Sequence, residues 1–238
     1  MNLILLSPDD FTDSPQRVRL TDRRYKHIRE ILKSSAGDEL CVGLINGKIG
    51  KGRILKVNDE AVDMEIFLDK DPPAPLPLIL ILALPRPIVL NRLFGSVAAL
   101  GVKKIILMQS NRVEKNYWKS PALKEENINA RLVLGLEQAK DTAMPEVLLR
   151  TKFKPFVEDE LPLLIKNTKA FLADSESPEP APYGNATKAA LVIGPEGGFI
   201  PYEAELLKAS GCVSVNFGKR VLRVETAVVA AIARLSHF

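Results

Sequence analysis

The chain has 238 residues, of which 46% are hydrophobic, and 33 Lys and Arg against 29 Asp and Glu give a formal net charge of +4. This length suffices for two domains or one large domain with a buried core. No apolar run reaches the roughly 18 residues that a membrane span needs. The two cysteines, Cys41 and Cys212, have no paired spacing, which argues against a disulfide framework or a zinc site. We therefore expect a cytoplasmic protein without a bound metal.

The first 72 residues predict a small β-barrel domain. Short runs of β-type residues are separated by glycines and by Asn58-Asp59, as in a small barrel. The runs are Leu3–Leu6, Leu40–Leu44, Arg53–Val57 and Val62–Phe67, and the separating glycines are Gly47, Gly50 and Gly52. One helix, roughly Thr21 to Lys33, interrupts them. Asp69–Pro77 then predicts a linker, because its prolines disfavour helix and remove hydrogen-bond donors from a sheet.

Basic residues gather in two parts of the chain. The first group holds seven basic residues against two acids and consists of Arg17, Arg19, Arg23, Arg24, Lys26, Arg29 and Lys33. The second holds seven against one acid and consists of Arg86, Arg92, Lys103, Lys104, Arg112, Lys115 and Lys119. Such groups suit contact with the phosphate backbone of a nucleic acid. A solvated helix face is an equally good interpretation of either group alone.

Residues 73–238 predict a single α/β domain. Apolar strands alternate with helical patterns, which implies a parallel sheet covered on both faces. The expected strands are Leu78–Leu82, Lys104–Met108 and Ala170–Ala173, and the expected helices are Ile88–Leu100 and Pro121–Lys140. A polar loop is expected from Asp174 to Thr187.

Two turns near the end of the chain carry the strongest functional signal. Each follows a short apolar strand and opens a helix, which is the arrangement that builds binding sites at the carboxyl ends of parallel strands. In the first, the strand Leu191–Ile193 leads into Gly194–Gly198, and Pro201 begins a helix. In the second, the strand Val213–Phe217 ends at Gly218, and a helix runs from about Val224 to Leu235. We expect the glycines to supply positive φ angles and to let a ligand approach the backbone.

The sequences of these turns, IGPEGGF (Ile193–Phe199) and FGKRVLRVETA (Phe217–Ala227), resemble the signature motifs of the RsmE family of 16S ribosomal RNA uridine N3-methyltransferases. That family belongs to the SPOUT class. The resemblance implies a SPOUT-type parallel sheet with a deep trefoil knot that holds S-adenosylmethionine, a PUA-like β-barrel at the amino terminus, and a homodimer that acts on 16S rRNA in the small ribosomal subunit. Knots are nearly absent elsewhere, so this expectation comes from the resemblance alone.

Weaker similarity extends over nearly the whole chain. The matching segments are His27–Lys33 with Gly37-Asp38, Leu82–Arg86, Leu100–Val102 and Glu137-Gln138. Two acids that the family usually carries are missing. Ala98-Ala99 stands where an acid precedes Leu-Gly-Val, and Ser110-Asn111-Arg112 stands where the family has Ser-Glu-Arg.

The resemblance also suggests site residues. Arg223 is the candidate for stabilising the anion that remains when N3 of uridine loses its proton; an ion pair with Glu225 or a phosphate contact is the other interpretation. Glu225 is a second catalytic candidate, as a proton acceptor or beside the cofactor's positive charge, and a helix-capping role is the alternative. The expected cofactor-binding residues are Gly194, Pro195, Gly197, Gly198, Phe217, Gly218, Leu222 and Thr226. The expected RNA-binding residues are Arg17, Arg19, Arg23, Arg24, His27, Arg86 and Arg112.

Several alternatives stay open at this point. His27 and His237 are the only histidines and have no ligand-spaced companions, and His27 suits domain packing as well as RNA contact. The last helix is apolar enough for a dimer interface or for ordinary core packing. Besides uridine N3 methylation, the sequence allows methylation of another RNA position, such as a ribose 2′-hydroxyl, and a non-catalytic rRNA-binding assembly factor.

Overall fold

The computed structural model describes residues 2–184 and 188–236, so Thr187 and His237 lie outside the described residues. The chain forms two compact units. The first comprises Met1–Ala74 and Val133–Met144, and the second Pro75–Leu132 and Pro145–Phe238. In the described parts of the chain, no helix has the length and apolar character needed to cross a membrane.

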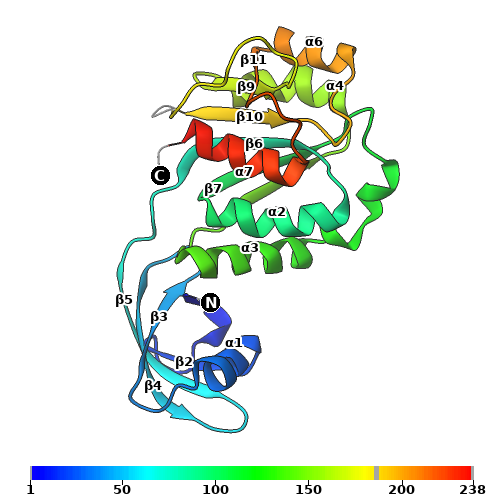
Figure 1. Ribbon diagram of the computed structural model, residues 1–238. Coiled ribbons are helices and arrows are strands. Elements are labelled where there is room, and N and C mark those ends of the chain that lie inside the picture. Colours follow the sequence, from blue (N-terminus) through cyan, green and yellow to red (C-terminus); the bar gives the residue numbers. More distant parts are fainter. Residues whose placement is uncertain (1, 185–187, 237–238) are drawn as a thin grey trace. The chain divides into compact units, whose positions relative to one another are not determined.

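The first unit is built on a curled five-stranded sheet (Figure 1). Its strands, in sheet order, are β1 (Ile4–Leu6), β3 (Glu39–Leu44), β4 (Ile49–Val57), β5 (Val62–Lys70) and β2 (Arg17–Leu20). β1 and β3 are parallel, and the other pairs are antiparallel. Alternate residues of these strands, such as Leu20, Val42 and Met64, fill a core that Ile28 closes. A short 3-10 helix, Pro8–Asp10, precedes β2.

The expected helix of this unit is present. It begins at α1 (Arg23–Lys26), where the side chain of Asp22 accepts a hydrogen bond from the backbone N–H of Arg24 at 2.9 Å, as an N-terminal cap does. It continues as a π-helix, His27–Leu32, and ends at Lys33, whose φ is +53°.

The strand β4 corrects the expectation that Gly50 and Gly52 separate strands. Both glycines lie inside β4, whose pairing with β5 shifts register between Ile49 and Gly50. A Cβ atom on Gly50 would lie 1.9 Å from the carbonyl oxygen of Phe67. Glycine within a strand often marks such a bulge and close backbone approach.

The segment 133–144 is packed in the first unit although it is distant in sequence. It includes the last part of α3 (Glu125–Ala139). The carboxylate of Glu137 is 2% exposed and accepts two hydrogen bonds from the guanidinium of Arg23, at 2.8 and 2.9 Å. The backbone N–H of Asn46 donates to the carbonyl of Thr142 at 2.8 Å.

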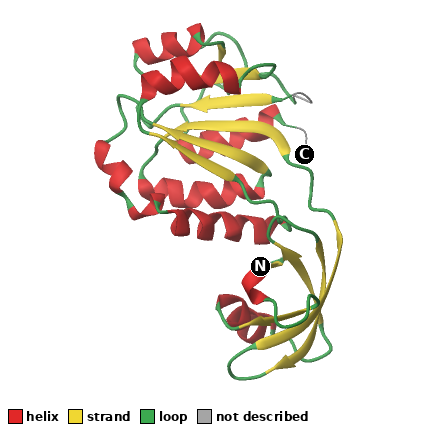
Figure 2. Ribbon diagram, turned by 180° about the vertical axis from the view of Figure 1, so that it is seen from behind, coloured by secondary structure: helices red, strands yellow, loops and turns green. Residues whose placement is uncertain are grey.

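The second unit contains the predicted parallel sheet (Figure 2). Its six strands, in sheet order, are β11 (Cys212–Val215), β9 (Lys169–Ala173), β10 (Ala189–Ile193), β6 (Leu76–Ala83), β7 (Val102–Met108) and β8 (Glu146–Arg150). All pairs are parallel. The sequence did not predict β8. The expected linker is also shorter, because β5 extends to Lys70 and β6 begins at Leu76; Pro77, which has no N–H, lies where the β6–β7 register shifts.

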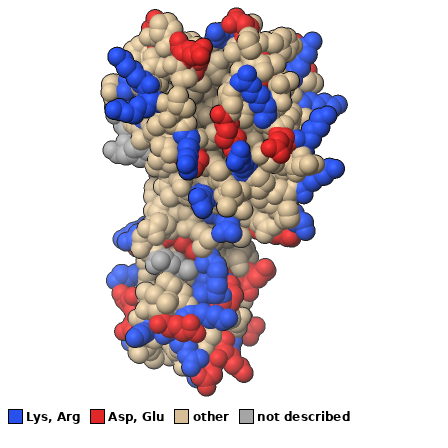
Figure 3. All heavy atoms as spheres, turned by 45° about the vertical axis from the view of Figure 1, so that its right-hand side comes forward, with Lys and Arg blue, Asp and Glu red and all other residues tan. Residues whose placement is uncertain are grey.

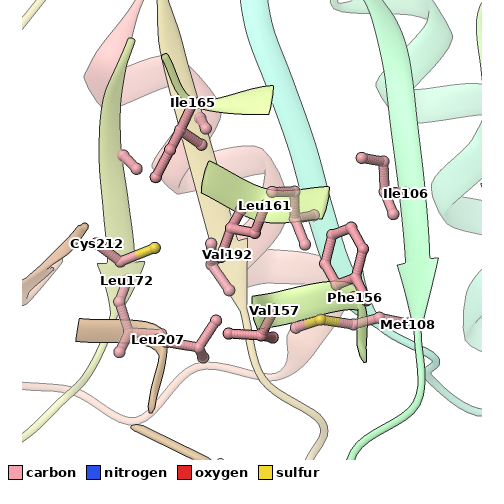
Figure 4. Close-up of a cluster of buried hydrophobic side chains, with 13 residues drawn as sticks. Ile106, Met108, Phe156, Val157, Leu161, Ile165, Leu172, Val192, Leu207 and Cys212 are labelled. Atoms are coloured by element: carbon pink, nitrogen blue, oxygen red, sulfur yellow. The ribbon is translucent and has the colours of Figure 1, made fainter. Parts of the chain in front are cut away.

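Helices cover both faces of this sheet. On one face, α2 (Pro87–Ala99) and α7 (Val224–Leu235) contact each other and the strands β7 and β10 (Figure 1). The other face carries α4 (Phe153–Pro155), a π-helix (Phe156–Glu160), α5 (Leu161–Leu164) and α6 (Pro201–Ala209). Figure 4 shows Phe156, Leu161 and Leu207 packed against side chains of the sheet.

Two helices expected in the second unit differ in how well their observed bounds agree with the sequence. The helix expected from Val224 to Leu235 is present with those bounds. The helix expected over Pro121–Lys140 begins later, because 3-10 turns at Lys115–Lys119 and Pro121–Leu123 precede α3, which starts at Glu125. The helices between Phe153 and Leu164 were not predicted.

Candidate functional site

A pocket opens at the carboxyl ends of four neighbouring strands of the second unit. Its volume is about 690 Å³, which suits a drug-sized ligand or a cofactor. The loops after β6, β9, β10 and β11 and the start of α7 contribute its lining residues: Arg86, Val89, Ala173, Asp174, Ser175, Ile193, Gly194, Pro195, Glu196, Gly198, Phe199, Phe217, Gly218, Arg220, Val221, Leu222, Arg223, Val224, Glu225 and Ala227. Parallel strands end at the same edge of a sheet, so one pocket collects loops that are far apart in sequence.

The loop after β10 is compact. A Cβ atom on Gly194 would lie 3.2 Å from the ring of Phe199 and 3.3 Å from the Cα of Gly198. Gly198 has φ +70°, and a Cβ there would meet nothing within 4 Å. Gly194 and Gly197 are not among the glycines with positive φ, which corrects the expectation that all three supply such angles. A Cβ at Gly194 would instead crowd the neighbouring loop residues, and the positive φ of Gly198 favours glycine there.

The loop after β11 leads into α7. The strand ends at Val215, earlier than expected, because the backbone of Asn216 turns to bond with Glu179 and Ala181. Gly218 has φ +121° and donates its N–H to the side chain of Asn216 at 3.2 Å. Phe217 and Leu222 then add apolar surface to the pocket.

Three guanidinium groups and three carboxylates line the pocket. The carboxylate of Glu196 accepts a long hydrogen bond, 3.4 Å, from the backbone N–H of Arg86 and lies 3.9 Å from its Nε. Asp174 accepts a hydrogen bond from the hydroxyl of Ser214 at 2.8 Å. The pocket thus contains positively and negatively charged groups beside apolar side chains such as Phe217 and Leu222.

The other charged side chains of the pocket are unpartnered. Within the described residues, Arg220, Arg223 and Glu225 form no hydrogen bond or ion pair through their side chains. The expected Arg223–Glu225 ion pair is absent there, and Arg223, at the N-cap position of α7, makes no side-chain cap. Glu225 lies in the first turn of α7, where a negative charge favours the helix, so its helix-capping alternative stays open. Both groups face the pocket and remain available to a ligand.

The expected cofactor-binding residues are largely brought together. Gly194, Pro195, Gly198, Phe217, Gly218 and Leu222 line the pocket. Two do not line it: Gly197 lies against the side chain of Arg112, and Thr226 is exposed on the first turn of α7. The contribution of β9, through Ala173, Asp174 and Ser175, was missed. The only sequence signal for it was a short apolar strand followed by a polar loop.

The expected RNA-binding residues of the first unit differ in availability. The guanidinium of Arg24 is buried and donates to the carboxylates of Asp10 and Asp22 and to the carbonyl of Leu5. Burial opposes its charge, but the two carboxylates outweigh burial and raise the pKa of Arg24. Arg24 therefore has a structural role inside the unit.

The remaining residues of that set lie nearer the surface. Arg23 binds Glu137, Arg19 forms an exposed ion pair with Asp63 at 3.2 Å, and Arg17 is exposed on β2. His27 is half-buried, its Nε2 has no hydrogen-bond partner among the described residues, and burial lowers the pKa of this imidazole. Positive charge in the sequence alone therefore does not distinguish arginines bonded to acids within the unit from arginines exposed to a nucleic acid.

In the second unit, Arg86 and Arg112 are both exposed. Arg86 lines the pocket, whereas Arg112 donates a hydrogen bond to the carbonyl of Gly197. Figure 3 shows Lys and Arg side chains spread over one face of this unit, with acidic side chains between them. Among the described residues, no group of three or more His, Cys, Asp or Glu is arranged to hold a metal ion.

Comparison with known families gives two matches. The pattern described as an RNA methyltransferase domain matches residues 72–236, and the pattern described as an RNA methyltransferase PUA domain matches residues 20–67.

Whole-chain relatives are similar along nearly their full length. The chain is 30% identical to a protein of Treponema pallidum named Ribosomal RNA small subunit methyltransferase E, over 98% of this chain and 90% of the relative. It is 27% identical to Ribosomal RNA small subunit methyltransferase E 1 of Borreliella burgdorferi, over 97% of this chain and 95% of the relative.

A crystal structure of Ribosomal RNA small subunit methyltransferase E from Neisseria gonorrhoeae, bound to S-adenosyl methionine, has a TM-score of 0.76. The two sequences are 20% identical, and the match covers 98% of this chain and 95% of the Neisseria gonorrhoeae chain. A Legionella pneumophila methyltransferase structure with the same cofactor has a TM-score of 0.74 at 23% identity, with 98% and 95% covered. These likenesses establish a shared fold.

Proposed function

The chain belongs to the ribosomal RNA small subunit methyltransferase E family, and from this membership we propose that it transfers a methyl group from S-adenosylmethionine to N3 of a uridine in 16S ribosomal RNA. The observation that carries the proposal is the pocket at the carboxyl ends of β6, β9, β10 and β11, where both signature turns meet.

The pocket fits the cofactor in size and chemistry. Its 690 Å³ falls within the range of cofactor sites. Apolar residues such as Ile193, Phe217 and Leu222 suit an adenine ring, while Gly198 and Gly218 leave open space where other residues would place a Cβ. When bound, S-adenosylmethionine supplies an electrophilic methyl group on a sulfonium centre.

Arg223 is assigned to stabilising the reacting base. The imide N3 of uridine carries a proton and is a poor nucleophile, so the site must accommodate the anion left by its removal. The Arg223 side chain is exposed, lines the pocket and has no partner among the described residues. A guanidinium remains charged and donates two parallel hydrogen bonds, which suits the carbonyl groups of a uracil anion.

Glu225 is assigned to accepting the proton. Asp174 is already bonded to Ser214, and Glu196 lies beside Arg86. Among the carboxylates of the described pocket, Glu225 alone is unpartnered, so it is best placed to take a proton.

We also assign the finer features of the fold and the RNA contacts. The β10 strand lies between β9 and β6, with β11 outside β9, an order compatible with a deep trefoil knot of the SPOUT class. The curled sheet of the first unit would be the PUA-like barrel. Residues 1–72, with which residues 133–144 pack, would form the RNA-binding domain, and the rest of 73–238 the catalytic one. Arg17, Arg19, Arg23 and His27 of that domain, with Arg86 beside the pocket, are the proposed RNA contacts. Arg24 is left out because its guanidinium is buried, whereas the Arg23 side chain stays 45% exposed beside Glu137. Arg112 is left out because its guanidinium bonds the carbonyl of Gly197.

A homodimer and a cytoplasmic location complete the proposal. Val221, which lines the pocket, is 90% exposed, and Val229 on α7 is 37% exposed, so these apolar side chains lack cover in one chain. A second copy of the chain would cover them. The proposed substrate, ribosomal RNA of the small subunit, supports a cytoplasmic location.

The first test is calorimetric titration with S-adenosylmethionine of the wild type, Gly198→Trp and Gly37→Trp. Both glycines have positive φ, +70° at Gly198 and +97° at Gly37, and open space around a Cβ, so both variants place a side chain on a left-handed backbone. Gly198 lines the pocket, whereas Gly37 lies in the first unit. We expect binding by the wild type and Gly37→Trp and loss of binding in Gly198→Trp.

Equal binding by the two variants would place the cofactor elsewhere.

Nucleoside analysis of 16S rRNA from a deletion strain then tests the target: loss of 3-methyluridine supports the proposed position, and loss of a ribose-methylated or other base-methylated nucleoside contradicts it. Absence of binding by the folded wild type would favour a non-catalytic RNA-binding protein.

A further inference from the structure

A loop that does not line the pocket is bonded to the glycine-rich loop that does. The loop Ser110–Arg112 follows β7, and the pocket loop Gly194–Phe199 follows β10. The guanidinium of Arg112 donates from Nη1 to the carbonyl oxygen of Gly197. The backbone N–H of Asn111 donates to Oε1 of Glu203 at 2.6 Å.

Glu203 joins the two loops through a buried carboxylate. Its side chain is 3% exposed and lies in the first turn of α6. While Oε1 accepts a hydrogen bond from the N–H of Asn111, Oε2 accepts one at 3.2 Å from the N–H of Ile200, the residue that directly follows the pocket loop. A buried carboxylate is stable only when hydrogen bonds replace its hydration. Each oxygen thus depends on a different loop, and the carboxylate fixes one loop against the other.

The pocket loop needs support from outside itself. Glycines restrict the backbone little, so a loop with Gly194, Gly197 and Gly198 has many accessible conformations. The Arg112 side chain lies along this loop, since a Cβ on Gly197 would be 3.0 Å from its Cδ. Gly197 does not line the pocket, but its neighbours Glu196 and Gly198 do. Contacts on the outer side of Gly197 therefore affect the inner wall.

We propose that Glu203 and Arg112 are positioning residues that hold the pocket loop in its ligand-binding shape. The proposal rests on the proposed function, because the ligand is taken to be S-adenosylmethionine. It adds two residues that act through the loop rather than by touching the ligand. It also gives Arg112 a role other than the RNA contact expected from sequence.

The same geometry accounts for one departure from the family pattern. The resemblance leads one to expect an acid at position 111, where this chain has Asn, yet the contribution of Asn111 to Glu203 is made by the backbone N–H. Any residue except proline supplies that donor. The connection between the loops is therefore independent of the side chain at position 111.

The test is calorimetric titration of the full chain with S-adenosylmethionine, using Glu203→Gln, Arg112→Ala, Arg112→Lys and the control Asn111→Ala. We expect Glu203→Gln to weaken binding by about tenfold or more, because an amide retains only one acceptor oxygen and turns an NH₂ group toward a backbone donor. Arg112→Ala should weaken binding less, since its hydrogen bond is exposed. Arg112→Lys should restore part of the loss, and Asn111→Ala should bind like the wild type.

Hydrogen exchange without ligand separates positioning from general stability. Faster exchange confined to the peptide covering residues 194–200, with unchanged exchange in β6 and β10, is the expected result. Unchanged cofactor affinity in both Glu203→Gln and Arg112→Ala overturns the proposal, as does weakened binding of 16S rRNA by Arg112→Ala with cofactor affinity intact. A wild type that binds no S-adenosylmethionine refutes the proposed function, and loop exchange then still reports whether the two residues hold the loop.

Discussion

Residues of one type have different roles in the first unit because their surroundings differ. The basic group from Arg17 to Lys33 contains a buried guanidinium at Arg24 and an ion-paired one at Arg23, whose partner Glu137 is distant in sequence. Asp22, which bonds Arg24, shows the same dependence: burial opposes its ionisation, but Arg24 outweighs burial and lowers the pKa of Asp22. The sequence identified the charges, and only their partners distinguish structural arginines from available ones.

Cys212 provides a test at the scale of a single residue. Burial raises the pKa of its thiol to about 12, from 9.0, so the nucleophilic thiolate is scarce at pH 8. We expect dithionitrobenzoate to modify the half-buried Cys41 in the native protein and Cys212 only after unfolding in urea. The folded state favours the neutral thiol of Cys212. The contribution of this thiol to the free energy of unfolding is therefore fully present below pH 9 and is lost as the pH rises toward 12.

The control for this experiment is Cys41→Ser, which removes the accessible thiol. Rapid reaction of native Cys41→Ser would contradict the expected protection of Cys212.

Elements with strong local signals were predicted well, and those that depend on neighbours were not. The turn from β10 to α6 and the start of α7 follow from apolar runs, glycine and a proline at the first helical position of α6. β2 was missed because its sequence, Arg-Val-Arg-Leu, also suits the solvated face of a basic helix. In β4, glycines that resemble strand breaks are required by the approach of the β5 backbone.

The pairing of β4 with β5 gives a prediction at this scale. Gly50→Ala places a methyl group on the carbonyl of Phe67, so we expect a loss of about 1–3 kcal/mol or more in the free energy of unfolding. The matched variant is Gly95→Ala in α2, where the Cβ would meet only the Arg131 carbonyl, at 3.6 Å. There we expect a gain of about 0.5–1 kcal/mol, because alanine favours a helix interior over glycine.

Urea denaturation followed by circular dichroism measures both changes. If Gly50→Ala unfolds at the wild-type urea concentration, the close approach of β4 and β5 is incorrect.

At the scale of the whole molecule, the chain does not divide at a single point. Residues 133–144 belong to the first unit although they lie inside the sequence of the second. Their attachment uses the Arg23–Glu137 ion pair and backbone bonds from Asn2 and Asn46. A boundary drawn near residue 72 from its prolines therefore separates this segment from its partners.

Truncation tests this organisation. A fragment comprising residues 73–238 retains Glu137 but lacks Arg23, so we expect it to aggregate or to melt below the full chain, as measured by calorimetry. Glu137→Gln should destabilise the full chain by about 1–3 kcal/mol, through loss of a charge-assisted hydrogen bond. In the fragment the same substitution should have little effect, because its partner is absent. An equally stable fragment would contradict the packing of 133–144.

The sequence by itself determined the parallel α/β character of the second unit, the two glycine-containing turns that line the pocket, and the family. Apolar periodicity, the glycines and the residues around Arg223 are local features that can be recognised in the sequence without a structure. The tertiary structure decided which charges are buried, that β9 contributes Asp174 to the pocket, and that Glu203 joins two loops. It also decided that Arg24 is structural and that 133–144 packs in the first unit. These are contacts between residues distant along the chain, and no spacing or composition encodes them, because their energy depends on neighbours that only folding brings together.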